Sequence, residues 1–184
     1  AYLQPLDSII KSNHGFVFPG YTEDCYLLVD FKTEAEATYR VLKEQLRPYA
    51  SWLRGPGGTY ASKGYVNIFL SGNRPIKTVI ADKKRLVTLD GRPEDLGKGY
   101  SAEVMPVVSQ AYYKYSNWQG EGQMPKADQE KIKELVAATH NENKRLRLWA
   151  NPDMPEGWAM LHRLGVDIIN TDHLEGLRDY LLKK

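Results

Sequence analysis

Two oppositely charged side chains stand two residues apart in the stretch YLLVDFKTEAE, which covers positions 26–36. Asp30 and Lys32 follow an apolar run, and alternate residues of a strand point to the same face of a sheet. A carboxylate at such a strand end suits a hard divalent cation, which prefers oxygen ligands. An ammonium beside it suits an anionic ligand. The alternative is an ion pair that caps the helix that follows, and the residues alone leave both interpretations open.

Polar side chains also follow two other apolar runs. LSGNRP places Asn73 and Arg74 after one run, and LDGRPEDL places Asp90 and Arg92 after another. Asn73, Arg74 and Arg92 are therefore candidate ligand-binding residues, with phosphate as the anion that arginine favours. Gly-Asn and Asp-Gly pairs are also ordinary turn sequences, and Arg92 could pair only with a nearby carboxylate.

The segment RLWANPD places Arg147 and Trp149 on one face of a further predicted strand. The arginine fork binds anions bidentately and the indole offers a flat wall to a ligand. The alternative puts the indole in the core and the guanidinium in a structural ion pair. Asp172, in INTDHLEGL, is expected to cap a helix and to reach the rim of the same site. The histidines form no spaced pair, so the sequence predicts no catalytic histidine.

Short apolar runs alternate with helical patterns along the chain, as in parallel sheets covered on both faces. Of the two runs at 77–81 and 85–89, the sequence allows that only one is a strand of the main sheet. The helices are expected to begin with capping residues such as Thr33 and Asp172 and to end with caps such as Gly165. The predicted strands are 26–30, 66–70, 77–81, 85–89, 105–109, 147–150 and 166–170, and the predicted helices are 33–49, 127–143, 155–164 and 172–182.

This alternation predicts an α/β fold with parallel strands. Polar residues after many strand ends favour a (β/α)8 barrel over a doubly wound sheet, which gathers its ligands at one switch point. About six strands can be assigned, whereas a full barrel has eight, so the barrel is expected to be incomplete. Residues 1–24 are expected to be a long connection. An incomplete barrel exposes sheet edges, which an oligomer or a swapped dimer would cover.

Composition narrows the class of protein. The 184 residues carry a net charge of +2 and a mean hydropathy of −0.52, which predicts one soluble domain over 1–184. The sequence has no apolar run long enough for a transmembrane helix, no signal-peptide pattern and no basic block suited to nucleic acid. Cys25 is the single cysteine and is expected to be a small buried side chain. RGPGGTYASKG matches no phosphate-binding glycine motif.

Several quoted segments together resemble one known superfamily. The run RLWANPDMPEGWAMLHRLGVDIINTDHLEGLRDYL, with LLVDFKTEAEAT, LSGNRP, MPVVSQAY and SNWQGEG, resembles the phospholipase C-like phosphodiesterases, and most closely their secreted bacterial members. That superfamily includes phosphatidylinositol-specific phospholipases C and glycerophosphodiester phosphodiesterases. The matches follow one another over nearly the whole chain. Asn151 stands where the family has threonine.

The resemblance implies a (β/α)8 barrel that hydrolyses a phosphodiester, such as a phospholipid headgroup, with Mg²⁺ or Ca²⁺. It assigns Asp30 to the metal, and Lys32, Trp149 and Asp172 to the substrate. The family's catalytic histidines and its Glu-x-Asp pair lie on the first two strands, which this chain lacks. The chain is thus expected to be the C-terminal two-thirds of a secreted or periplasmic metal-dependent phosphodiesterase, inactive alone and with no catalytic residue of its own.

Two other functions remain open. A barrel remnant without catalysis could bind a ligand or form oligomers, and stable association without turnover would identify it. A sugar-processing enzyme ranks last, because the sequence offers no carboxylate pair at a suitable spacing.

Overall fold

The computed structural model describes residues 2–21, 23–56 and 66–183. They form two compact units, Ala1–Asp90 and Gly91–Lys184, and each unit is described by itself. The prediction of a single domain over 1–184 stays a prediction. Most of the RGPGGTYASKG loop lies outside the described residues.

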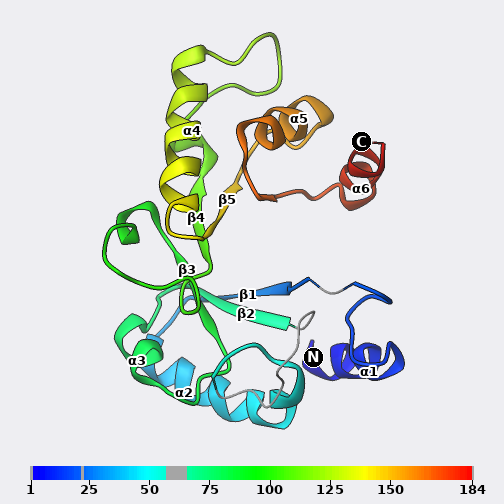
Figure 1. The fold of residues 1–184 in the computed structure, drawn as a ribbon, viewed down its shortest axis with the longest axis vertical. Helices are drawn as coiled ribbons and strands as arrows, with labels where there is room; N and C mark the ends of the chain where they lie inside the picture. Colours follow the sequence, from blue (N-terminus) through cyan, green and yellow to red (C-terminus); the bar gives the residue numbers. More distant parts are fainter. Residues whose placement is uncertain (1, 22, 57–65, 184) are drawn as a thin grey trace. The chain divides into compact units, whose positions relative to one another are not determined.

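The first unit is a parallel sheet with helices on one side (Figure 1). β1 and β2 pair in parallel along their whole length, with Leu28 opposite Phe69, and β3 pairs with β2 through Leu70 and Leu89. A 3₁₀ segment, Arg47–Trp52, follows the second helix. The elements are α1 (Leu3–Ser12), β1 (Cys25–Phe31), α2 (Ala35–Leu46), β2 (Val66–Gly72), α3 (Ile76–Ala81) and β3 (Thr88–Gly91).

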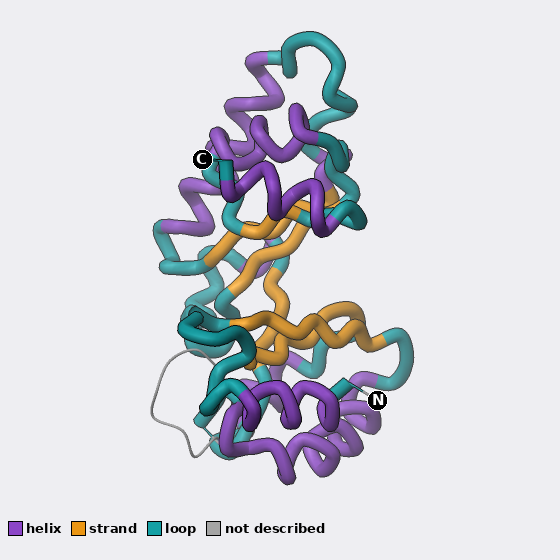
Figure 2. The backbone as a smooth tube through the Cα atoms, turned by 90° about the vertical axis from the view of Figure 1, so that its right-hand side faces the viewer, coloured by secondary structure: helices purple, strands orange, loops and turns teal. Residues whose placement is uncertain are grey.

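The two faces of this sheet differ because side chains alternate along a strand. Ile68 and Leu70 share one face of β2 and are fully buried. The tube in Figure 2 shows the helices of this unit covering one side of its strands. The opposite face is also largely buried and mixes polar with apolar side chains. On it the hydroxyl of Thr88 donates to Oδ1 of Asn67 at 2.7 Å, and the rings of Tyr26 and Phe69 meet edge to face. The sheet therefore carries an apolar face and a mixed face, whose polar residues Ser71 and Asp90 lie toward the carboxyl ends of the strands.

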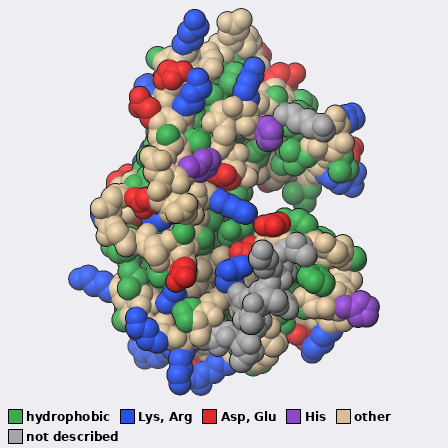
Figure 3. All heavy atoms as spheres, in the orientation of Figure 1, with side chains coloured by type: hydrophobic (Ala, Val, Ile, Leu, Met, Phe, Trp, Pro, Cys, Tyr) green, Lys and Arg blue, Asp and Glu red, His purple; other side chains and the backbone are tan. Residues whose placement is uncertain are grey.

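Charged side chains cover the helical side of this unit, where lysine and arginine gather on the face seen in Figure 3. One lysine and two hydroxyl groups bind acidic side chains between α2 and α3. Lys43 pairs with Asp82 at 2.5 Å, Tyr39 donates to the same carboxylate at 2.8 Å, and Thr78 donates to Glu36 at 2.9 Å. These contacts attach α3 to α2.

The second unit repeats the pattern of parallel strands followed by helices. Ser109 of β4 lies opposite Arg147 of β5, which lies opposite Ile168 of β6. Two 3₁₀ segments, Pro93–Asp95 and Tyr112–Lys114, flank β4. The elements are β4 (Val107–Ala111), α4 (Lys126–His140), β5 (Arg145–Trp149), α5 (Pro155–Leu164), β6 (Ile168–Ile169) and α6 (Leu174–Leu182).

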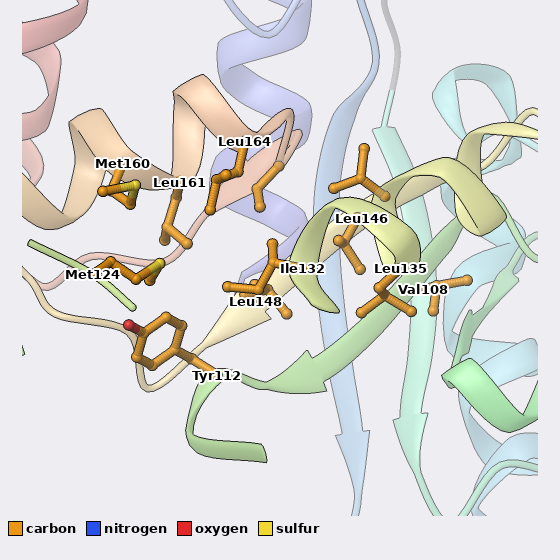
Figure 4. Close-up of a cluster of buried hydrophobic side chains, with 12 residues drawn as sticks. Val108, Tyr112, Met124, Ile132, Leu135, Leu146, Leu148, Met160, Leu161 and Leu164 are labelled. Atoms are coloured by element: carbon orange, nitrogen blue, oxygen red, sulfur yellow. The ribbon is translucent and has the colours of Figure 1, made fainter. Parts of the chain in front are cut away.

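One apolar cluster holds this second unit together (Figure 4). Leu146 and Leu148 project from β5 and are fully buried. They meet Ile132 from α4 and Leu161 from α5. Full burial of one leucine side chain stabilises a fold by about 1.5–3 kcal/mol, so this cluster fixes both helices on the sheet.

Several predicted elements differ from the structure. The leading segment is a helix, α1, whose Ile10 is buried and whose Asp7 accepts a bond from the indole of Trp52 at 2.9 Å. Positions 77–81 belong to helix α3 and not to a strand, because a short apolar run fits both and its packing decides.

The predicted helix starts were also wrong in part. α2 begins at Ala35 and α6 at Leu174, and neither has a side-chain cap, so Thr33 and Asp172 do not cap them. α5 spans the predicted residues, and Gly165 ends it with φ +90°. α6 has no buried residue, so its leucines do not belong to the core.

The structure confirms an α/β fold with parallel strands. Among the described residues, no helix is both long and apolar enough to cross a membrane.

Candidate functional site

Asp30 and Lys32 do lie together at the carboxyl end of β1. Nζ of Lys32 is 2.5 Å from Oδ2 of Asp30, and the two side chains are 78% and 38% exposed. This contact fits an ion pair and also fits a ligand site in which the lysine would move to an incoming anion. The roles predicted for both residues stay predictions.

A glycine brings the end of β2 against the end of β1. A Cβ atom on Gly72 would lie 2.2 Å from the carbonyl oxygen of Phe31 and 2.3 Å from Oδ1 of Asp30, and its φ is +68°. The N–H of Asn73 donates to the carbonyl of Phe31 at 2.9 Å. Only a residue without a side chain fits this approach, so Gly72 fixes the position of Asp30.

The end of β3 joins the same edge. The Ser71 hydroxyl donates to Oδ2 of the fully buried Asp90 at 2.7 Å, and Nη1 of Arg74 donates to the Asp90 carbonyl at 2.6 Å. The side-chain amide of Asn73 donates to the carbonyl of Thr33 at 3.0 Å. Arg74 and Asn73 thus help hold the strand ends together, and Asp30, Ser71 and Asp90 end three adjacent strands.

Arg92 belongs to the second unit and turns the chain after β3. Its N–H donates to Oδ2 of Asp95 at 2.9 Å, and its Nη1 donates to the carbonyl of Gly91 at the same distance. These local bonds give Arg92 a structural role in the turn. Its predicted role in binding a ligand stays a prediction. Within residues 2–21, 23–56 and 66–183, no three histidine, cysteine or acidic side chains gather in a metal-binding group. The predicted Mg²⁺ or Ca²⁺ at Asp30 stays a prediction.

The second unit carries its own polar face at β4, β5 and β6. Arg147 donates through Nη2 to Oδ1 of Asn170 at 2.5 Å, which orients the guanidinium. Ser109 lies directly opposite Arg147 in the neighbouring strand, and its side chain is 1% exposed. Its hydroxyl has no hydrogen-bond partner among the described residues. Asn170 is the contributor to this site that sequence reasoning missed.

An aromatic pair stands beside this arginine. Trp149 follows Arg147 on the same face, and its ring meets that of Tyr113 edge to face, with centroids 6.0 Å apart. Trp149 is 36% exposed and Tyr113 56% exposed, so neither ring is in the core. The interpretation of Trp149 as a core residue was therefore wrong. Tyr113 could not be found from sequence, because it follows a different strand.

The backbone after Trp149 adopts a conformation that side chains disfavour. Ala150 has φ +55°, in the left-handed region where residues other than glycine are uncommon. The side-chain amide of Asn151 donates to the carbonyl of Asn170 at 3.1 Å and holds the turn against β6. Strain of this kind is more frequent at functional sites, which marks the end of β5 as a candidate.

Asp172 contacts the loop after β5 through its backbone, and its predicted place at the rim of the site stays a prediction. Its N–H donates to Oδ2 of Asp153 at 2.7 Å, and the indole of Trp158 donates to Oδ1 at 2.8 Å. Burial raises the pKa of Asp153, but hydrogen bonds from Thr171, Asp172 and Trp158 outweigh it and hold that pKa below 3.8. Asp153 therefore joins the loops after β5 and β6, and the exposed Asp172 side chain lines a groove of about 660 Å³.

Comparison with known proteins gives one similarity. The chain is 26% identical over 191 aligned residues to a protein of Eremothecium gossypii named altered inheritance of mitochondria protein 6. The alignment covers 91% of this chain and 49% of that protein, so the chain spans about half the length of this curated relative. No family model matches the chain, and no solved structure is significantly similar to it.

These findings correct the predicted family and function. The resemblance to phospholipase C-like phosphodiesterases is wrong, because no model of such a family matches and the similarity found is to a protein named for mitochondrial inheritance. The predicted hydrolysis of a phosphodiester and the predicted secreted or periplasmic location rested on that resemblance and are wrong as well. Most of the matched segments contain the end of an apolar strand and the polar residues that follow it. A parallel α/β sheet produces such junctions whatever its chemistry.

Proposed function

We propose that this chain is the ligand-binding part of a protein that acts in mitochondrial inheritance. The similarity to the Eremothecium gossypii protein, which spans 91% of the chain, supports that role. Because the chain covers about half of that relative, the cellular role belongs to the longer protein, and this part contributes a site for a small molecule.

The observation that carries the ligand site is the hydroxyl of Ser109. It is buried beside Arg147 and has no hydrogen-bond partner within the described part of the chain. A buried polar group left without a partner costs about 1–3 kcal/mol. A ligand that reaches this hydroxyl by displacing the side chains over it recovers this energy, so the position favours a bound molecule with a hydrogen-bonding group.

The neighbours of Ser109 define the chemical class of the ligand. Arg147, oriented by Asn170, supplies positive charge and a planar fork that suits a carboxylate or phosphate group. Trp149 and Tyr113 supply partly exposed rings next to that charge. We therefore infer a small anion attached to a flat ring, with the anionic group at Arg147 and the ring against Trp149.

Calorimetric titration with adenosine monophosphate and with inorganic phosphate tests this class. Adenosine monophosphate is expected to bind at least about tenfold more tightly, because stacking of one base on an aromatic side chain is worth about 1–3 kcal/mol. Trp149→Ala should remove the difference between the two probes. Arg147→Gln should weaken both, since it removes the charge.

Lys32→Met is the matched control, because it removes an exposed cation from the other unit. It should leave both affinities unchanged. Equal affinities for the two probes in the wild-type protein, or an effect of Lys32→Met as large as that of Arg147→Gln, would contradict the assignment to β4–β6.

The cellular role is tested in the source organism of the protein. Removing the protein should change the fraction of daughter cells that receive mitochondria, scored by a fluorescent mitochondrial marker. Re-expression of the wild-type protein should restore that fraction, and the Arg147→Gln variant should not. Normal inheritance in cells without the protein would end the proposal of a role in mitochondrial inheritance.

We also propose that the parallel strands belong to a (β/α)8 barrel. Each of the six described strands is followed by an α-helix or a 3₁₀ segment, and polar side chains collect at their carboxyl ends, as in such barrels. A crystal structure of the full-length protein tests this, and an open sheet in that structure would contradict it.

A further inference from the structure

The outer edge of β1 is unusually exposed for an apolar parallel strand. β1, with the sequence CYLLVDF, pairs with β2 on one side, and no described strand pairs with its other side. Residues 25–29 are only half-buried, whereas the corresponding part of β2 is fully buried. Parallel strands are normally covered on both faces, and an open apolar edge is a template for another strand.

A groove beside this edge extends the exposed apolar surface onto α2. The groove has a volume of about 570 Å³ and lies between Val29 and Phe31 of β1 and Ala37, Val41 and Leu42 of α2. Val41 is 59% exposed.

The sequence of α2 predicts that these exposed apolar residues would be buried. Ala37, Val41 and Leu42 recur at the spacing that places apolar residues on one side of a helix, which normally faces a core. In the structure the buried residues of α2 are Tyr39 and Leu46 instead. The apolar side of α2 thus has no cover among the described residues, and it adjoins the open edge of β1.

We propose that a further strand and helix of the same polypeptide, outside these 184 residues, dock on this surface. The strand pairs in parallel with the free edge of β1, and the helix packs its apolar side on Val41. The length of the relative supports this occupant, because about half of that protein lies outside the alignment. A strand–helix unit is also the repeat that both units of this chain already use.

The docked unit must match the chemistry of the groove. Its strand needs apolar side chains toward Val29 and Phe31, and its helix needs an apolar stripe toward Val41. Lys32, Thr38 and Gln45 also line the groove, so the docked unit presents polar side chains where it meets them. The inference does not depend on the ligand site of β4–β6, so either proposal can fail without the other.

Hydrogen exchange tests the docking directly, with the 184-residue chain compared with the full-length protein. Amides in residues 25–31 are expected to exchange at least about tenfold more slowly in the full-length protein, because pairing protects those that face the open edge. Residues 66–72 serve as the internal control and should change little, since β2 is already buried.

A substitution on the groove gives the second readout. Val41→Lys should leave the melting temperature of the 184-residue chain unchanged, because the side chain is largely exposed there, and should lower that of the full-length protein by several degrees. Arg40→Ala, on the same helix but facing the groove toward α3, is the matched control and should affect neither.

Two results would overturn the proposal. The first is equally fast exchange of residues 25–31 in both proteins. The second is protection that already appears in the 184-residue chain, increases with concentration and accompanies a doubled mass in light scattering. That second result would assign the surface to another copy of this chain.

Discussion

Gly72 shows how one residue can set the geometry of a strand edge. Both its positive φ and the 2.2 Å approach to the carbonyl oxygen of Phe31 exclude a side chain. Asp30 keeps its place only because this approach is possible, so the candidate site of the first unit depends on a residue with no chemistry of its own.

Gly72→Ala is expected to destabilise the chain more than a glycine substitution that meets only backbone strain. Left-handed backbone alone costs an alanine about 1–2 kcal/mol, and here a clash with backbone is added. Gly20→Ala is the control, because φ is +73° there and the new Cβ atom meets nothing within 4 Å. Urea unfolding measures both. Equal losses would mean that the end of β2 shifts freely and that Gly72 does not fix Asp30.

Asp153 gives a pH-dependent contribution to stability. Its hydrogen bonds lower its pKa below 3.8 in the folded state. A carboxyl whose folded pKa is depressed stabilises the fold fully above its unfolded pKa, and this contribution disappears as the pH falls through the folded value.

We expect Asp153→Asn to cost about 1.5–3 kcal/mol near pH 6, the value of hydrogen bonds to a charged group. The difference in unfolding free energy between wild type and variant should shrink as the pH falls below about 4. Denaturant unfolding at several pH values measures it. A difference that stays constant down to pH 2 would show that Asp153 is not held ionised by these bonds.

At the scale of elements, a buried lysine connects two loops of the second unit. The Lys144 side chain is 0% exposed and pairs with Glu142, which also accepts a bond from the N–H of Gly97 at 2.6 Å. The Lys144 ammonium and this N–H hold the pKa of Glu142 below 4.5. The pair attaches the end of α4 to the segment that precedes β4.

Glu142→Gln should destabilise the chain by about 3 kcal/mol, since it leaves a buried ammonium without its counter-charge. Lys144→Met combined with Glu142→Gln should cost less than Glu142→Gln alone, because the buried charge is gone. Thermal and urea unfolding of the two single variants and the double variant measure the coupling. Additive losses would show that the two side chains do not act as a pair.

Helix and strand boundaries were predictable where local chemistry set them. α5 begins at Pro155 and ends before Gly165, as the sequence predicts, because proline suits a first turn and glycine accepts left-handed backbone. Positions 77–81 were not predictable, since their apolar run fits a strand or a helix. Their contacts with α2, such as Thr78 to Glu36, favour the helix.

At the scale of the whole molecule, the open question is whether the two units unfold together. The sequence predicts one domain, and the structure contains two compact units. Each unit contributes only three described strands, which is near the minimum for independent stability. We therefore expect a single cooperative transition.

Leu148→Ala tests this expectation, because it opens a cavity in the second unit alone. It should cost about 2–5 kcal/mol, as expected for removing a fully buried leucine side chain. Hydrogen exchange should then accelerate in β2 of the first unit as well as in β5. Acceleration confined to residues 91–184 would show that the units unfold separately.

The sequence by itself determined the α/β class, most strand positions and the polar residues at strand ends, because alternation and turn chemistry act over a few residues. It did not determine the function: the short junctions that suggested a phosphodiesterase reflect the fold and not its chemistry. The tertiary structure decided that Ser109 and Asn170 join Arg147, that Tyr113 meets Trp149, and that the apolar side of α2 is exposed. These outcomes depend on contacts between residues far apart in the chain, which no local pattern encodes.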